Sequence, residues 1–320
     1  MSDPKIVAAL SELKLEKAAL APLPDLSVLR FTGADAEAFL QSQLTQDVAA
    51  LPAGHAALAG YCTAKGRLLA TGVLLRSAGQ DAEPGFDWIV RADLAATLQK
   101  RLTMFVLRSK VKIALLEGAV HGLLEPADAP SSGLPSAPWA LASTALGLAI
   151  RAPSVAAFDR YWLIGARPDA EETVPVPAYF ELLDCLVGLP WVSAATQDLF
   201  IPQTLNLELI GGVSFSKGCY PGQEIVARSH YRGLVKRRAS LGVIEQALPD
   251  AAGQDLFLPE QTSAASRIIQ AAVVADRTWV LWEATKDTLA APGLRAGAPD
   301  GPVLHPLALP YSLNLQGAES

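Results

Sequence analysis

The chain has 320 residues, 51% of them hydrophobic and 18% charged, with a formal net charge of -6. This length favours two or three domains, and this composition excludes a disordered chain. No apolar run reaches the ~18 residues that span a bilayer, so we expect no membrane partner. Three widely spaced cysteines, Cys62, Cys185 and Cys219, indicate a reducing, cytoplasmic compartment rather than a disulfide framework.

The predicted elements of the first 116 residues mix helices with strands. Apolar residues at helical spacing predict helices from Pro4 toward Pro22, after Thr32–Asp35, and over Asp93–Leu102. The expected strands are Leu26–Phe31, Ala56–Cys62, Leu68–Leu75, Phe86–Val90 and Val111–Leu116. The Lys65-Gly66 pair between two of these strands predicts a hairpin turn.

The pattern changes twice in the remainder of the chain. Residues 126–138 are rich in proline and serine, which predicts an exposed loop. Strands near Leu148 and over Tyr161–Ile164 and a helix over Ala178–Val187 follow. Short strands then come at Ala239–Ile244, Ile268–Val274, Trp279–Trp282 and Val303–Leu304, which favours a small all-β barrel. The predicted class is therefore α+β, with a region 1–237 and a C-terminal barrel 238–320.

The octapeptide from Lys217 to Glu224, KGCYPGQE, is the most informative part of the sequence. Its glycines and its Pro-Gly pair predict a loop that displays Cys219, with Cys62 and Cys185 as core residues. A nearby ammonium such as that of Lys217 would favour the thiolate, so we expect a functional thiol with Lys217 as its activator. Gln223 and Glu224 can accept hydrogen bonds and orient a ligand.

A basic run follows the octapeptide. Between Lys217 and Arg238 there are six basic residues and one acid, in a protein that is acidic overall. This contrast favours an anionic ligand over ordinary solvated surface. No metal site is expected, because the four histidines are scattered and no CxxC motif is present.

The octapeptide, together with Pro202-Gln203, Asn206 and residues 211–215, closely resembles the signature of the YgfZ family. These are folate-binding proteins related to the T-protein (aminomethyltransferase) of the glycine cleavage system. Residues 31–41 and 43–48 look like the N-terminal helix of that family, and residues 64–67 look like its hairpin turn. The motif is long and chemically unusual, which makes a chance match improbable.

The resemblance implies a ring of three domains: two interleaved α+β lobes and a C-terminal β-barrel. Tetrahydrofolate, or another reduced folate, would bind in the central opening. Family members support iron–sulfur cluster assembly or repair and thereby tRNA modification, so the implied partners are folate and iron–sulfur client or assembly proteins. Carried over to this chain, the motif falls on Lys217, Gly218, Cys219, Tyr220, Gly222, Gln223 and Glu224, with a basic tail at Arg228 and Arg232.

Two departures argue against ordinary aminomethyl transfer. The transferase relative has paired aspartates after its hairpin turn, one of them catalytic, where this chain has Ala70 and Thr71. Neither can accept a proton at neutral pH. The relative also holds the pterin ring with a glutamate, at a position that Leu186 occupies here.

Three other readings remain open at this stage. One is a folate-dependent one-carbon (aminomethyl) transferase, which needs a general base that is not evident. Another is direct tRNA binding through the basic run and Tyr231, which the sequence pI of about 5.3 and the 7% aromatic content disfavour. The last is a hydrolase with Cys219 as nucleophile, which would need His230 as a base.

Overall fold

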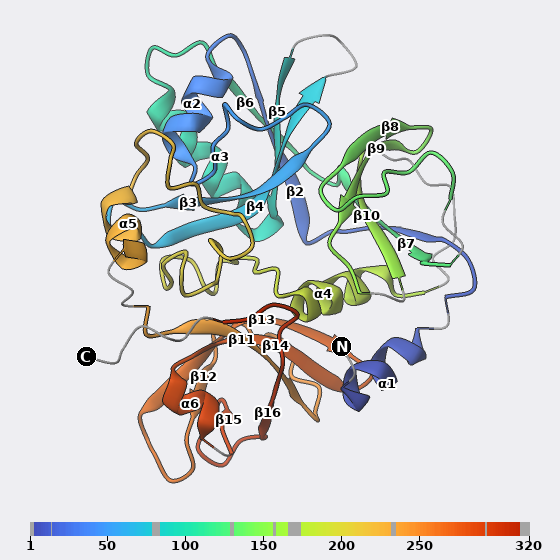
Figure 1. Ribbon diagram of the computed structural model, residues 1–320, viewed down its shortest axis with the longest axis vertical. Helices are drawn as coiled ribbons and strands as arrows, with labels where there is room; N and C mark the ends of the chain where they lie inside the picture. Colours follow the sequence, from blue (N-terminus) through green and yellow to red (C-terminus); the bar gives the residue numbers. More distant parts are fainter. Residues whose placement is uncertain are drawn as a thin grey trace.

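The computed structural model describes residues 3–13, 15–78, 84–128, 131–155, 158–165, 174–231, 235–291 and 293–313. It is a mixed α+β protein, as predicted, built on three antiparallel sheets. In Figure 1 two sheets lie side by side in the upper part of the molecule, the third lies below them, and helix α4 runs between the two layers.

The first sheet carries the predicted hairpin. Its strand order is β3 (Ala56–Cys62), β4 (Leu68–Ala78), β5 (Pro84–Arg91), β2 (Leu26–Thr32) and β6 (Lys112–Leu116). Strands β3 and β4 pair from Ala56 opposite Leu75 to Cys62 opposite Leu68, which confirms the hairpin. Helices α2 (Ala36–Gln43) and α3 (Ala92–Val106) belong to this part of the chain, and α3 packs on β2, β5 and β6.

The second sheet corrects the N-terminal prediction. Its strand order is β1 (Ala19–Pro22), β7 (Val120–Pro126), β10 (Phe158–Ile164), β9 (Gly147–Ala152) and β8 (Leu141–Thr144). The first helix, α1 (Pro4–Glu12), begins at an Asp3 side chain that accepts from the Lys5 N–H, but it ends well before Pro22. Residues 19–22 instead form an edge strand, where proline is tolerated because one side of the strand needs no donor.

Helix α4 (Val176–Val187) packs against the third sheet and also contacts β1 and β7. It is buried on most sides, which explains its nearly continuous apolar sequence. The third sheet has the order β15 (Arg295–Ala296), β12 (Asp255–Phe257), β13 (Ala264–Val274), β14 (Arg277–Ala284), β11 (Arg238–Ile244) and β16 (Leu304–Leu307), with the short helix α6 (Lys286–Ala290) beside it.

The core placements expected from the sequence hold. Cys62 and Cys185 are buried, and Trp279 and Trp282 lie fully inside the C-terminal part. Over the parts of the chain that the structure describes, no helix is long and apolar enough to cross a membrane. The division at residue 237, the closure of the barrel and the three-domain ring stay predictions.

Candidate functional site

The motif loop, residues 213–222, lies between α2 and helix α5 (Gln223–Tyr231), near the β3–β4 hairpin. Figure 1 shows this gold segment and α5 at one edge of the molecule, beside β3. The Ser214 N–H donates to the Thr45 carbonyl, and the Thr45 hydroxyl donates to the Gly212 carbonyl. The loop is therefore fastened to the chain that follows α2.

Lys217 is buried and makes the strongest attachment of the loop. Its Nζ donates to the carbonyl oxygens of Gln41 at 2.6 Å, Leu44 at 2.6 Å and Gln46 at 2.9 Å. Carbonyls at the C-terminal end of a helix lack intrahelical partners and carry the negative end of the helix dipole. Lys217 thus acts as a cap for the end of α2.

This geometry gives Lys217 a different role from the predicted one. An ammonium has three hydrogens, and three backbone carbonyls take them all. Among the described atoms, no hydrogen bond joins Lys217 to the Cys219 sulfur. Burial lowers the pKa of Lys217 to about 8, opposed by Asp47; the three carbonyls also favour the charged form. Lys217 anchors the loop, and among the described atoms no hydrogen bond to the sulfur supports its expected role as activator of Cys219.

Tyr220 is the second anchor of the loop. Its ring is buried, its centre lies 5.3 Å from the Lys217 Nζ in a cation–π contact, and burial raises its pKa. Its hydroxyl is buried and has no hydrogen-bond partner within the part of the chain that the structure describes. This burial favours Tyr220 as an anchor of the loop rather than as a platform on which a ligand ring stacks.

Cys219 lies between these two anchors and is exposed, as predicted. Its neighbour Gly218 is also exposed, and a Cβ built there would meet no atom within 4 Å. Lys217 and Tyr220 turn inward while Gly218 and Cys219 face solvent. The loop is therefore shaped to present one sulfur at the surface from a fixed base.

The hairpin turn touches the motif loop through two glycines. Gly222 has φ +80°, and a Cβ there would lie 2.4 Å from the Thr63 carbonyl oxygen and 2.5 Å from the Gly66 Cα. Only glycine permits this backbone conformation together with so close an approach. The turn places Lys65 and Arg67 at the surface. The two segments singled out in the sequence, residues 64–67 and the octapeptide, thus form one unit.

Helix α5 was not predicted. It begins at Gln223 directly after the Pro-Gly turn, and the buried Gln203 side chain donates to its Val226 carbonyl at 2.7 Å. Glu224 and Arg228 are exposed on it, one helical turn apart, with 3.9 Å between their charged groups. The ligand-orienting roles of Gln223, Glu224 and Arg228 stay predictions, and Arg232 lies outside the described residues.

The basic run does not form one anion-facing strip, which corrects the sequence interpretation. Arg238 is buried, donates to the Gln203 carbonyl at 2.9 Å and is ion-paired with Glu208. Arg237 pairs with Glu283 at 3.3 Å. Arg238, in β11, joins the segment before the motif loop to the third sheet, whereas Arg237 pairs with a residue of that sheet, in β14. In an acidic chain, a local run of basic residues suggested an anion-binding surface, although Arg238 is used inside the protein.

The two positions compared above with the paired aspartates of the transferase relative are built into the core. Ala70 is fully buried. The Thr71 hydroxyl donates to the Pro190 carbonyl at 2.8 Å and accepts from the Val192 N–H at 2.9 Å. Leu186, at the position compared with the pterin glutamate, is also fully buried. These side chains stabilise the packing of β4 and α4.

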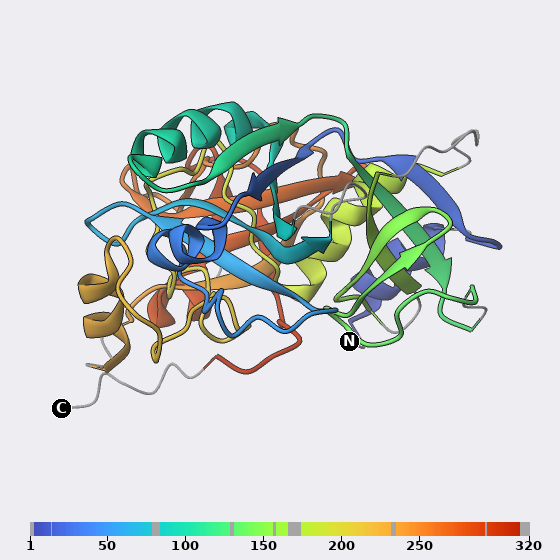
Figure 2. The same ribbon diagram turned by 90° about the horizontal axis from the view of Figure 1, so that it is seen from above.

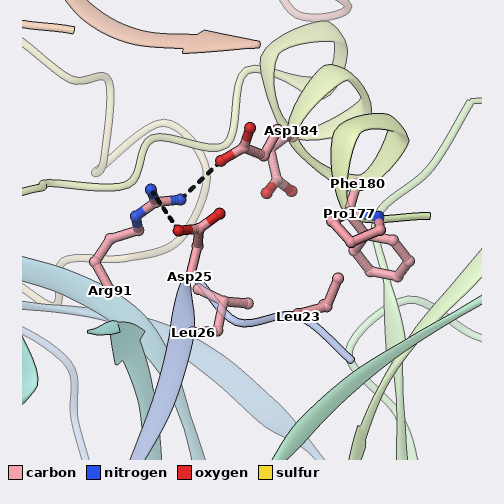
Figure 3. A pocket seen from close by; sticks show the side chains of 8 residues that line it. Leu23, Asp25, Leu26, Arg91, Pro177, Phe180 and Asp184 are labelled. Atoms are coloured by element: carbon pink, nitrogen blue, oxygen red, sulfur yellow. Dashed lines mark hydrogen bonds and ion pairs between the residues drawn. The ribbon is translucent and has the colours of Figure 1, made fainter. Parts of the chain in front are cut away.

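A pocket beside α4, which we call the α4 pocket, was missed by sequence reasoning (Figure 3). Arg91 lies 3.1 Å from Glu181 and 3.9 Å from Asp25, and burial raises the pKa of Glu181 while Arg91 opposes the shift. The only available signal was a pair of acids, three residues apart, in the apolar α4 segment. The pocket is lined by Leu23, Asp25, Leu26, Arg91, Pro177, Phe180, Glu181 and Asp184.

Asp184 carries a buried charge beside this pocket. Its Oδ1 lies 2.7 Å from the Arg160 Nη1, and its Oδ2 accepts from the Trp191 indole N–H at 2.8 Å. Arg160 is fully buried and also donates to the Pro153 and Phe180 carbonyls. No cluster of three or more His, Cys, Asp or Glu side chains that could hold a metal occurs within the residues given above.

The structure does not join the α4 pocket to the motif loop. No motif-loop residue lines the pocket. In Figures 1 and 2, α5 lies at one edge of the molecule and α4 near the middle. The chain therefore has two separate polar centres, and the sequence motif marks only the outer one.

Comparisons with known proteins place the chain in a family. No family model matches the sequence. The tRNA-modifying protein YgfZ of Edwardsiella ictaluri (strain 93-146) is 34% identical over 235 residues, which cover 67% of this chain and 68% of that protein. The crystal structure of glycine cleavage system aminomethyltransferase T from Bartonella henselae is similar with a TM-score of 0.67, over 91% of this chain and 85% of that one, at 14% identity. The mixed α+β fold is thus of the aminomethyltransferase type, and the chain belongs to the YgfZ family.

Proposed function

We propose that the protein is a folate-binding accessory factor that supports iron–sulfur cluster assembly or repair and, through it, tRNA modification. The observation that carries this proposal is the exposed Cys219 sulfur, held between the inward-facing Lys217 and Tyr220 in a motif of the YgfZ family. The relative from Edwardsiella ictaluri is named as tRNA-modifying, which supports a role in tRNA modification.

The chemistry of the α4 pocket fits the ring of a reduced folate. A pterin is flat and presents adjacent N–H donors along one edge. The pocket offers apolar surface from Leu23, Leu26 and Phe180, with carboxylates at Asp25 and Glu181 that can accept from such donors. These residues would hold the ring, and the bound folate would supply one-carbon carrying capacity.

The pocket offers fewer contacts to the glutamyl tail of a folate than to its ring. Arg91 is the cation of the pocket, and its guanidinium already faces Asp25 and Glu181. A folate in this pocket would have to extend toward α5 for its glutamyl carboxylates to meet Arg228. We therefore expect the ring contacts to dominate affinity, with a smaller contribution from Arg228.

Calorimetric titration with tetrahydrofolate tests this part of the proposal. Wild type should bind, and Glu181→Gln should weaken binding by about tenfold, because a charged acceptor is lost. Arg228→Ala should weaken it less, and the remote surface variant Arg277→Ala should leave it unchanged. A wild-type titration without heat, and without competition from folate analogues, would rule folate binding out.

The role of the thiol needs a separate experiment. In cells that lack the native protein, Cys219→Ser should fail to restore the activity of iron–sulfur tRNA-modifying enzymes that wild type restores. Because Cys219 is exposed, thermal unfolding of the variant should match wild type, which separates loss of function from loss of fold. Equal rescue by Cys219→Ser would show that the thiol is dispensable.

Aminomethyl transfer is not part of this proposal. The hydroxyl of Thr71 is committed to Pro190 and Val192, and Ala70 has no polar group. Product formation from a methylene donor and tetrahydrofolate, at a rate above the uncatalysed reaction, would contradict this reading.

A further inference from the structure

The C-terminal end of α3 carries a concentrated apolar surface that the proposed function does not use. Met104 is 62% exposed, Phe105 46% and Leu107 88%. They are three of the nine exposed large apolar side chains among the described residues. We call Met104, Phe105 and Leu107, with the basic residues around them, the α3-end patch. Figure 2 shows α3 on the outer surface of the molecule, over the first sheet.

Leu107 occupies an unusual backbone conformation. It ends α3 with φ 46° and ψ -102°, a positive-φ conformation that glycine adopts far more readily than leucine. With 88% of the residue exposed, little packing is available to offset the strain. A strained, exposed leucine at a turn is unfavourable in water, so a contact outside the chain is the simplest reason for its presence.

The chain segment that carries these apolar residues is strongly basic. Residues 100–112 contain five bases and no acid, in a chain of net charge -6. One acid from another segment, Asp35, lies beside it, and its side chain accepts a hydrogen bond from the Lys110 N–H at 2.7 Å. Arg101 donates to the Tyr61 hydroxyl, whereas Lys100, Arg108, Lys110 and Lys112 make no ion pair within the part of the chain that is described.

We propose that the α3-end patch binds the surface of an anionic lipid bilayer, with Met104, Phe105 and Leu107 entering the headgroup region and the bases contacting lipid phosphates. Apolar side chains beside a basic cluster suit such a surface, because burial and electrostatic attraction add there. A stable protein interface needs roughly 800 Å² from each partner, far more than three side chains at the end of one helix supply. The expectation of no membrane partner concerned a spanning segment, which this contact does not require.

Vesicle binding of the full-length protein tests the proposal. Wild type should sediment with large unilamellar vesicles of phosphatidylcholine that contain roughly one third phosphatidylglycerol, but not with pure phosphatidylcholine vesicles. Binding should weaken as salt rises above about 0.15 M, where screening acts within ~8 Å. Leu107→Asn should reduce affinity by about tenfold, and it should not harm folding, since the exposed leucine has little packing to lose.

Two matched controls separate this surface from general effects. Leu146 is 44% exposed in the β8–β9 turn, so Leu146→Asn removes an exposed leucine elsewhere and should bind like wild type. Arg108→Glu should reduce affinity by about tenfold, while Lys286→Glu, with the same charge change on α6, should have little effect.

Three outcomes would overturn the proposal: no binding of wild type to the anionic vesicles, equal losses in patch and control variants, or an unchanged affinity for Leu107→Asn. In the first case, cross-linking in cells from position 107 to an acidic protein would reassign the patch to a protein partner.

Discussion

The motif loop and the α4 pocket use charge in opposite ways. In the motif loop the buried cation of Lys217 is bound by backbone carbonyls, and the sulfur of Cys219, two residues further on, faces solvent. In the α4 pocket, the buried Asp184 and the half-buried Glu181 are paired with arginine side chains. The comparison teaches that residues of one sequence motif can have different roles: Lys217 and Tyr220 anchor the loop, whereas Cys219 faces solvent.

The largest loss of stability is expected when a buried carboxylate loses its ion-pair partner. Arg160→Met leaves Asp184 buried without its cation, so the free energy of unfolding should fall by about 3–5 kcal/mol. Urea denaturation would measure it. The surface pair Arg277–Glu245 is the control, since Arg277→Met should cost less than about 1 kcal/mol. Similar costs for the two variants would contradict the difference between buried and exposed pairs.

The second-largest loss of stability is expected from disrupting the contact between the motif loop and the hairpin turn. Gly222→Ala forces a Cβ against the Thr63 carbonyl in a positive-φ conformation, and should destabilise by about 3 kcal/mol. Gly218→Ala, in the same motif, has open space and should unfold like wild type. Thermal unfolding of the pair decides the matter: a stable Gly222→Ala protein would mean that the two segments are not in contact.

The role of Lys217 can be tested against its predicted role as activator. Lys217→Met removes the donor from three carbonyls and should lower stability by about 2 kcal/mol. The alkylation rate of Cys219 in the folded variant should stay the same. Lys65→Met, on the exposed hairpin turn, is the control and should change neither quantity. An unaltered stability with a slower alkylation rate would restore the activator role.

The smallest effect concerns pH at the α4 pocket. Burial holds the pKa of Glu181 above its usual range, so the folded state binds more protons than the unfolded state between the unfolded pKa of about 4.5 and the raised folded value. The unfolding free energy of wild type, relative to Glu181→Gln, should therefore fall as pH rises through this window. Denaturation at several pH values measures the difference, and a rise would contradict the assigned cause.

Local patterns predicted most of the elements. Strand β3 was predicted with its exact ends, and β2, β5, β6, β11 and α4 within a few residues, because alternation and helical spacing are local properties. Strand β7 was missed since its Val120–Pro126 sequence shows no alternation and is buried on both sides. Helix α5 was missed because the Pro-Gly turn before it and its charged residues are typical of a loop.

By itself, the sequence determined the family signature, the α+β class and the exposure of Cys219, since these depend on residues close together in the chain. Only the tertiary structure decided that Lys217 caps α2, that Arg238 is internal and that an acidic pocket forms beside α4. The partners of these groups come from distant segments: Gln41 precedes Lys217 by 176 positions. The sequence does not show whether a charged side chain is solvated by water or bound by buried carbonyls, because the partner is brought to it only by folding.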